Sequence, residues 1–267
     1  MSLGPAIRFS PAQRWALGVL LALASARAAA GEAQPFVFLH TGDPELGKPD
    51  VASTAARFAL VAARANAIGA DLVIIPGDLV HGCTSEELKA FDGVLRQFKM
   101  PVKVVPGNHD RPDVFEKHFG PDHYVFTHNN SDFICLNSNR FVGPADPRQD
   151  AQWKWLEAAL EDAQRQKRSH VFVVMHHPIA QEAPLRELLA RHHVAAVLCG
   201  HLHTTQEFAA DGFTVYVSPS TARLRDDKGF AYRVFKVYPD RVEQEVVPLD
   251  REVARIDLKA PAAGPAK

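Results

Sequence analysis

Five short apolar runs, each followed at once by polar residues, constrain the fold of this chain more than any other feature. The runs are rich in valine, isoleucine and phenylalanine, and they occupy 36–39, 72–76, 102–106, 171–175 and 195–199. Runs of this length, bounded by glycine and polar residues, are typical of buried strands. The stretches between them carry helical patterns, at 51–68, 84–98, 149–166 and 184–192. This alternation predicts an α/β fold with a sheet of substantial parallel character.

The pattern changes after residue 203. Apolar segments at 214–217, 230–237 and 242–247 are separated by glycine, proline and aspartate, which are turn residues. They predict a closing antiparallel portion. We expect one domain over 31–252, followed by a disordered tail over 253–267 that is rich in alanine and proline.

The first thirty residues are a different kind of sequence. Arg8 and Arg14 lead into an apolar stretch at 15–24, and small residues follow at 25–30. This order is typical of a secretory signal peptide. The apolar stretch is too short to span a bilayer of roughly 30 Å as a helix. We therefore expect a signal peptide over 1–30, a periplasmic or secreted protein and no integral membrane domain; a membrane anchor at 15–24 is the alternative.

Charge and cysteine content exclude several classes. The chain has 30 Lys and Arg against 31 Asp and Glu, a net charge of -1, so no nucleic-acid polymer is expected as a partner. Its three cysteines, Cys83, Cys135 and Cys199, are too few for a disulfide-built scaffold, and none is spaced as a pair of metal ligands. The two later ones lie in apolar runs, which favours buried free thiols.

The polar residues that follow the strands have the chemistry of a metal site. The carboxyl ends of parallel strands meet at one edge of a sheet, so these side chains are expected to converge. They are Asp43, Glu45, Asp78, Asn108, His109, Asp110, His176, His177, His201 and His203. Carboxylates with imidazoles and an amide, but no thiolate, suit divalent ions such as Mn, Fe or Zn.

The number of ligands favours two ions. So many donors exceed the needs of one ion, and a pair of ions roughly 3.5–4 Å apart would use them. His201 and His203 stand two apart on a segment expected to be extended, so their side chains should diverge toward different ions. Each cluster alone fits an ordinary turn, and it is their joint occurrence at strand ends that favours a site.

The same clusters make the chain resemble a known family, the calcineurin-like metallophosphoesterases. The resemblance runs from about residue 36 to residue 249 and rests on five ordered blocks: Asp43-Pro44-Glu45, Gly77-Asp78, Gly107-Asn108-His109-Asp110, His176-His177-Pro178 and Gly200-His201-Leu202-His203. It implies central β-sheets packed as a sandwich and flanked by helices in four layers. It also implies a dinuclear metal site at the strand ends.

The resemblance implies a role for each matching residue. Asp43 and His203 match ligands of the first metal, and Asp78 matches the bridge between the metals. The second metal's ligands are matched by Asn108, His176 and His201. The implied reaction is in-line attack on phosphorus by a hydroxide that two divalent ions (Mn, Fe, Zn or Mg) activate. His109, oriented by Asp110, matches the general acid or phosphate-contacting imidazole.

One position departs from the family pattern. The first block is most often Asp-x-His in this family, and Glu45 stands at the histidine position. As a ligand it would favour harder ions such as Mn or Mg. As a neighbour of the ligands it would hold a water or another side chain. A branch with Asp-Pro-Gln at this point resembles the chain more closely.

The substrate class stays open at this stage. Ser218-Pro219-Ser220-Thr221 resembles members that cleave small phosphodiesters, including cyclic nucleotides and glycerophosphodiesters. The resemblance to the Asp-Pro-Gln branch indicates phosphomonoesters or phosphoproteins instead. We therefore expect a hydrolase acting on a phosphorylated small molecule or a phosphoprotein. The alternatives are a non-catalytic binding protein of the same fold and a member with a mononuclear site.

Overall fold

The computed structural model describes residues 34–142 and 146–258. The predicted signal peptide therefore lies outside the described residues, as do residues 259–267 of the predicted tail. From Pro35 onward the described residues belong to one compact unit. Over the described part of the chain, no helix combines the length and hydropathy needed to cross a bilayer.

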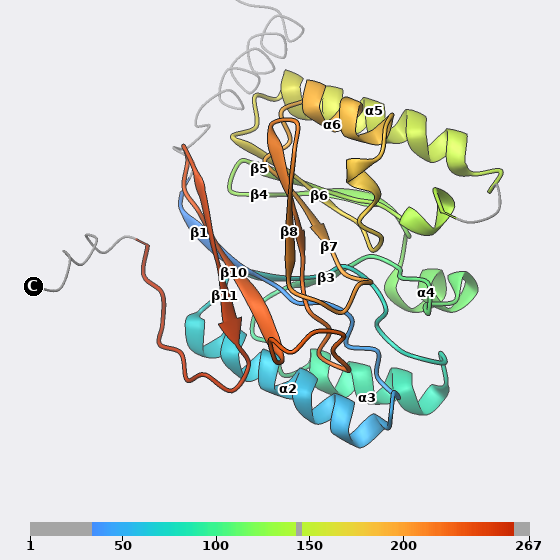
Figure 1. Cartoon of the computed structure of the whole chain (residues 1–267), viewed down its shortest axis with the longest axis vertical. Coiled ribbons are helices and arrows are strands. Elements are labelled where there is room, and N and C mark those ends of the chain that lie inside the picture. The colour runs from blue at the N-terminus through green and yellow to red at the C-terminus, as the bar shows by residue number, and fades with distance from the viewer. Residues whose placement is uncertain (1–33, 143–145, 259–267) are drawn as a thin grey trace, which may run out of the picture. The chain divides into compact units, whose positions relative to one another are not determined.

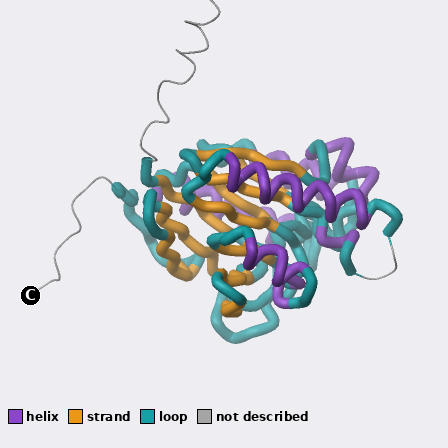
Figure 2. The backbone as a smooth tube through the Cα atoms, turned by 90° about the horizontal axis from the view of Figure 1, so that it is seen from above, coloured by secondary structure: helices purple, strands orange, loops and turns teal. Residues whose placement is uncertain are grey.

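The strands form two mixed sheets (Figures 1 and 2). The first sheet has the order β11 (Val242–Pro248), β10 (Ala231–Val237), β1 (Phe36–His40), β2 (Leu72–Ile75) and β3 (Val102–Val104). The second has the order β4 (Tyr124–His128), β5 (Ser131–Cys135), β6 (His170–Val174), β7 (Ala196–Cys199), β9 (Phe213–Val217) and β8 (Gln206–Ala210). In both sheets the central pairs β1–β2 and β6–β7 are parallel, as the strand–helix alternation predicts.

The helices cover the outer faces of the two sheets, which gives four layers. Two helices, α5 (Gln149–Arg165) and α6 (Leu185–Arg191), lie on the second sheet, whereas α2 (Val51–Ile68) and α3 (Ser85–Leu95) lie on the first (Figure 1). Between the sheets, the ring of Phe38 stacks on Phe235 at 4.6 Å and meets Phe133 edge-on at 5.4 Å. Each sheet thus buries both faces, and the predicted sandwich flanked by helices is confirmed.

Local signals set the ends of the first two helices. The Asp50 carboxylate accepts a hydrogen bond from Ser53 N at the start of α2, and Gly69 ends that helix in the left-handed region with φ 72°. At the start of α3, Thr84 and Glu87 form a capping box. Both helices pack on the outer face of the first sheet.

Three strands and one α-helix were not predicted, although β5 is buried along its whole length. Strand β8 lies at a sheet edge and alternates half-buried with exposed residues. Strands β4 and β5 form a hairpin at the opposite edge. The helix α4 (Pro112–Phe119) buries only Phe115 but begins with a proline in its first turn, a start signal that could have been used. The run at 102–106, predicted as a buried strand, is half-buried along β3 because this strand too is at an edge.

The closing antiparallel portion is confirmed with one correction. The pairs β8–β9 and β10–β11 are antiparallel hairpins, but they belong to different sheets. Strand β9 also pairs in parallel with β7 and so extends the second sheet. The antiparallel segments therefore complete both sheets rather than forming a separate layer.

The first part of the predicted tail does not behave as a tail. Val253, Ile256 and Leu258 pack against the core beside the first sheet, and Ile256 N donates a hydrogen bond to Ile68 O. The packed part of the chain therefore continues past the predicted boundary at 252, at least to Leu258.

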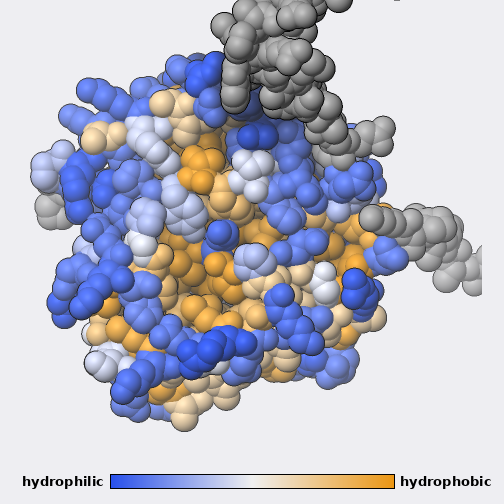
Figure 3. All heavy atoms as spheres, turned by 180° about the vertical axis from the view of Figure 1, so that it is seen from behind, coloured by the Kyte–Doolittle hydropathy of each residue, from blue (hydrophilic) through white to orange (hydrophobic). Residues whose placement is uncertain are grey.

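The described surface exposes little large apolar area. Apolar residues gather in the middle of the face opposite to that of Figure 1, with hydrophilic residues around them (Figure 3). Among the described residues, Val125 is the exposed large hydrophobic side chain, at 42%. The apolar area in Figure 3 is therefore made of half-buried side chains. Cys135 and Cys199 are buried free thiols, as predicted, and Cys83 is half-buried and free.

Candidate metal centre

The predicted site residues lie in loops that leave the carboxyl ends of strands in both sheets. Asp43, Asp78 and Asn108 follow β1, β2 and β3 of the first sheet. His176 follows β6 and His201 follows β7 of the second. His176 Nε2 lies 3.3 Å from Asp78 Oδ2, so the two sets of loops meet. The site is built across the junction of the sheets.

The backbone is strained at these loops. Five of the predicted site residues have left-handed φ values: Asp43 (37°), Glu45 (36°), Asp78 (49°), His201 (68°) and His203 (55°). Each such conformation costs on the order of 1–3 kcal/mol for a non-glycine residue and persists where its surroundings hold it. The surroundings here include Ser220 Oγ, which donates to Asp43 O at 2.7 Å. Strain gathered in this way is typical of functional sites.

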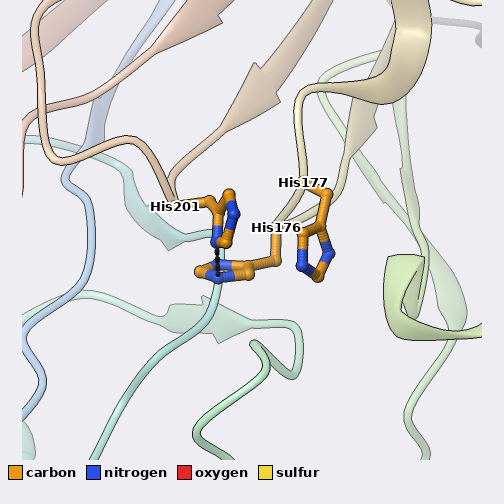
Figure 4. Close-up of side chains that lie close together, drawn as sticks. All are labelled: His176, His177 and His201. Carbon is orange, nitrogen blue, oxygen red and sulfur yellow. Dashed lines mark hydrogen bonds between the residues drawn. The ribbon is translucent and has the colours of Figure 1, made fainter. Parts of the chain in front are cut away.

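Four donor atoms form the tightest part of the site. His176 Nε2 lies 3.0 Å from Asn108 Oδ1, 3.2 Å from His201 Nδ1 and 3.3 Å from Asp78 Oδ2. Figure 4 shows the imidazoles of His176 and His201 turned toward each other. Ligands about 2.0–2.1 Å from a tetrahedral zinc ion are separated by about 3.3 Å, so these spacings fit one shared ion. We refer to Asp78, Asn108, His176 and His201 as the four-residue half of the site.

A second group contains Asp43, Asp78 and His203. One ligand atom of each lies within 4.8 Å of the others, and all three side chains are buried. Among the described residues His203 Nδ1 has no hydrogen-bond partner although it is buried. A buried imidazole nitrogen without a partner is costly, and a bound cation would satisfy it. We refer to these residues as the three-residue half; it shares Asp78 with the other half.

His201 and His203 diverge, but not for the predicted reason. Both have left-handed φ values, so the segment that carries them is not extended. The turn places His201 Nδ1 beside Asn108 and His176, whereas His203 groups with Asp43 and Asp78. Backbone curvature rather than strand alternation separates the two imidazoles, and their division between two metals stays a prediction.

Glycines let the loops approach one another. A Cβ on Gly200 would lie 2.6 Å from Asp43 Oδ1, and a Cβ on Gly77 would lie 2.8 Å from His176 Nδ1. A Cβ on Gly107 would overlap Asp78 Oδ1. Three blocks of the sequence therefore need glycine, because a ligand side chain or, at Gly77, also the backbone of Gly107 occupies the space that a Cβ would fill.

Burial and crowded charge make the metal-free site electrostatically unfavourable. Burial, together with the charge of Asp78, raises the pKa of Asp43 and of Asp110 to about 7. Burial alone would lower the pKa of His176, but its hydrogen bond with Asp78 and the charges of Asp43 and Asp78 raise it to about 9. Buried carboxylates need cationic or hydrogen-bonding partners. The donor set, its negative charge and the unpartnered His203 nitrogen therefore fit divalent cations.

Asp110 contacts the loop backbone rather than the His109 ring. Its carboxylate accepts hydrogen bonds from Gly107 N at 2.8 Å and Leu79 N at 3.0 Å. In the described structure this carboxylate accepts all its hydrogen bonds from backbone N–H groups. The predicted orienting role is thus indirect: Asp110 fixes the loops that carry Asp78 and Asn108.

A comparison with known families decides what kind of protein carries this site. The model of the family described as calcineurin-like phosphoesterase matches residues 20–205. The chain belongs to this family. The blocks that contribute all the ligands named above fall within the matched range, as the resemblance predicts.

The curated relatives named here are distant, and each aligns with part of this chain. The 3',5'-cyclic adenosine monophosphate phosphodiesterase CpdA of Escherichia coli strain K12 is 28% identical, over 57% of this chain and 61% of its own length. A protein of Arcobacter nitrofigilis named "probable glycerophosphodiester phosphodiesterase GpdQ" is 30% identical, over 50% of this chain and 56% of its own. The alignment thus spans less than two thirds of each relative.

A solved structure supports the fold. The dimetal phosphatase of Danio rerio superimposes with a TM-score of 0.65, covering 80% of this chain and 96% of that one at 16% identity. Identity this low shows likeness of fold only. It places this family member among sandwiches of two sheets flanked by helices.

Several residues that support the site were missed or left without a role. Ser138 Oγ accepts a hydrogen bond from His177 N at 2.9 Å and lies 3.0 Å from His177 Nδ1. Asn139 Nδ2 donates to Gly107 O at 3.0 Å. These two residues lie in the short helix η1 (Ser138–Arg140) after β5. Residues 133–138 also resemble the family, but a resemblance of sequence gives no contact.

Proposed function

We propose that this chain is a metal-dependent phosphoesterase that hydrolyses a phosphate ester by in-line attack of water at phosphorus. The observation that carries the proposal is the sharing of the Asp78 carboxylate between two groups of ligand atoms. A shared carboxylate between adjacent donor groups is the arrangement of a two-metal site for phosphoryl chemistry.

The site residues fall into two groups, and each group would hold one ion. The four-residue half would hold one ion through an amide oxygen, two imidazoles and Asp78. The three-residue half would hold the other through Asp43, Asp78 and His203. Two divalent ions bound there would supply positive charge at the phosphoryl oxygens and lower the pKa of the attacking water.

His109 is proposed as the proton donor to the leaving oxygen. Its backbone N donates to Asp78 Oδ1 at 2.9 Å, which ties its position to the shared ligand. Its side chain is 28% exposed, so the ring lies at the open side of the site where a substrate would enter. An alkoxide needs a proton to leave near neutral pH, and an imidazole is suited to that transfer.

Small phosphodiesters are the first substrate class to test. CpdA and GpdQ carry the names of enzymes acting on a cyclic nucleotide and on glycerophosphodiesters. The Ser218–Thr221 block favours the same class. The Asp-Pro-Glu sequence of the first block keeps phosphomonoesters and phosphoproteins as the second class.

The test is metal content combined with turnover. The purified protein is loaded with Mn²⁺, Fe²⁺ or Zn²⁺, its bound metal is counted by mass spectrometry, and bis(4-nitrophenyl) phosphate, 4-nitrophenyl phosphate and 3',5'-cyclic AMP are offered. About two ions per chain with turnover of any ester are expected. One ion with turnover would favour the mononuclear alternative, and no ion with no turnover would favour a binding protein.

We also propose that the protein is exported, on the basis of the signal pattern over 1–30. Fractionation of cells expressing the full chain would test this. Recovery of the protein in the cytosol at its full mass would contradict it.

A further inference from the structure

The side chain of Glu45 is fully buried, although it lies in the loop that follows β1. The main chain fixes this position. Glu45 N donates to Asp78 O at 2.8 Å, and His81 N donates to Leu46 O at 2.9 Å. The segment at Glu45 and Leu46 therefore runs beside the segment that leads from Asp78 to His81, with an isolated bridge between Leu46 and Val80. Burial of a carboxylate is costly unless charged or hydrogen-bonding partners surround it.

Its partners are cations and imidazoles at the edge of the site. Glu45 Oε1 lies 2.9 Å from His81 Nδ1, 3.6 Å from His109 Nε2 and 3.9 Å from Lys48 Nζ. Glu45 Oε2 lies 3.4 Å from Arg223 Nε, an ion-pair distance without hydrogen-bond geometry. The rings of His81 and His109 are 4.9 Å apart, so one carboxylate lies against both. All four partner side chains are partly exposed, at 28–37%, whereas Glu45 is at 0%.

We infer that Glu45 is a positioning residue that holds His81, His109 and Arg223 at the substrate side, and is not a metal ligand. The inference rests on the proposed function, because it assigns these groups to the substrate side of the same site. It chooses between the two roles left open for this position. The atoms of Glu45, His81 and His109 form a group of their own that could hold an ion, and this group is separate from that of Asp43, Asp78 and His203. The contact of Glu45 Oε1 with His81 Nδ1 at 2.9 Å already gives the carboxylate a partner, which favours the positioning role.

This arrangement gives Glu45 a distinct task. A carboxylate at the family's histidine position is turned toward the proposed proton donor and toward an arginine that can contact a phosphoryl oxygen. Arg223 is held from its other side as well, since its backbone N donates to Ser220 Oγ at 3.2 Å. Removing the negative charge would release Lys48, Arg223 and the His109 ring from Glu45, and it would leave the proposed metal ligands in place.

The experiment compares wild type with Glu45→Gln, which keeps the shape and removes the charge. Two ions per chain should remain, counted by mass spectrometry after loading with Mn²⁺ alone. With an alkyl ester of the class that wild type cleaves, kcat should fall about 10²-fold, the scale of lost general acid–base assistance. With the matching 4-nitrophenyl ester, whose leaving group needs no proton, kcat should fall no more than a few-fold.

Two further variants sharpen the test. Glu45→His restores the family's common residue; it should lose the alkyl-ester rate as Glu45→Gln does, without raising the metal count. Glu87→Gln is the matched control, because Glu87 is also buried and caps α3 without touching an imidazole. It should leave both rates within a few-fold of wild type.

The outcomes separate this inference from the proposed function. Loss of one ion in Glu45→Gln would make Glu45 a ligand and overturn the inference, with the two-metal phosphoesterase intact. An equal fall for both esters, or no fall, with two ions bound would overturn it too. If wild type itself binds no ion and cleaves no ester, the proposed function fails and the inference fails with it.

Discussion

The two halves of the metal centre share Asp78 but differ in how completely their donor atoms are assembled. In the four-residue half, three donors lie 3.0–3.3 Å from His176 Nε2 and come from both sheets. In the three-residue half, Asp43, Asp78 and His203 supply the ligand atoms, one fewer residue, and the neighbouring Glu45 faces His81. Ion affinity rises with ligand number and with the rigidity of the site. The two positions should therefore bind their ions with unequal affinity.

The largest expected effect comes from removing the residue that the halves share. Asp78→Asn should bind neither ion firmly and lose about 10³-fold or more in kcat, because each half loses a charged ligand. Metal counting and turnover of the preferred ester measure this. Asp132→Asn, a buried aspartate paired with Arg168 in the second sheet, is the control and should keep both ions. A fully active Asp78→Asn protein would show that the halves are independent.

Stepwise removal of metal should separate the halves. A chelator titration of the loaded wild type should show two steps, the weaker one from the three-residue half. His203→Ala should abolish the weaker step and His201→Ala the tighter one, each with about a 10²-fold loss in kcat. A single step in wild type, or the reverse assignment in the variants, would contradict the predicted difference in affinity between the two halves.

A smaller effect is expected from crowding the three-residue half. In Gly200→Ala the new Cβ would lie 2.6 Å from Asp43 Oδ1, so the carboxylate has to move. Overpacking of this kind costs about 1–3 kcal/mol, and we expect about a 10-fold fall in kcat with the weaker metal step lost first. Gly93→Ala is the matched control, since the nearest atom to its Cβ is Arg96 Nη2 at 3.9 Å. It should be fully active and slightly more stable, because alanine favours a helix interior.

The smallest effect is on stability and concerns His40, the last residue of β1. His40 Nε2 donates to Cys199 O at 3.1 Å and so links β1 to β7. Burial, helped by the charge of Arg233, lowers the pKa of His40 to about 3. The unfolded chain takes up this proton below about pH 6.5, so the stability contribution is complete above that pH and is lost as the pH falls. Between pH 7 and pH 5 the loss is about 2 kcal/mol.

Urea unfolding of the metal-free protein at the two pH values measures this contribution. His40→Gln should lose about 2 kcal/mol less than wild type over the same interval, because glutamine does not titrate. Equal losses in the two proteins would contradict the assignment to His40. Other titrating groups of the site contribute alike to both proteins and cancel in the difference.

The sequence predicted the location of the site better than the directions of its side chains. Asp43, Asp78 and His176 could be placed because each follows an apolar run that has to be a buried strand. The backbone turn at His201 and His203 could not be predicted, because left-handed φ values in a loop depend on contacts from distant strands. The same holds for Asp110, whose carboxylate is satisfied by N–H groups of two loops.

Elements at the margins were harder to predict because burial there is partial. Strand β8 has no fully buried residue and helix α4 buries Phe115 alone of its residues, so each gives the sequence a short apolar pattern. Val253, Ile256 and Leu258 pack on the core from a stretch that is otherwise polar. Composition alone predicts a tail for such a stretch, because the packing depends on these three side chains.

The pairing of the first strand has a consequence for the order in which the molecule is made. Phe36 pairs with Val237 and His40 with Arg233, so β1 lies between a strand made soon after it and one made long after it. A ribosome that has added the last proposed ligand, His203, has not yet made β10. The first sheet cannot close until synthesis has passed Val237. Nascent chains that lack β10 should therefore bind these ions poorly.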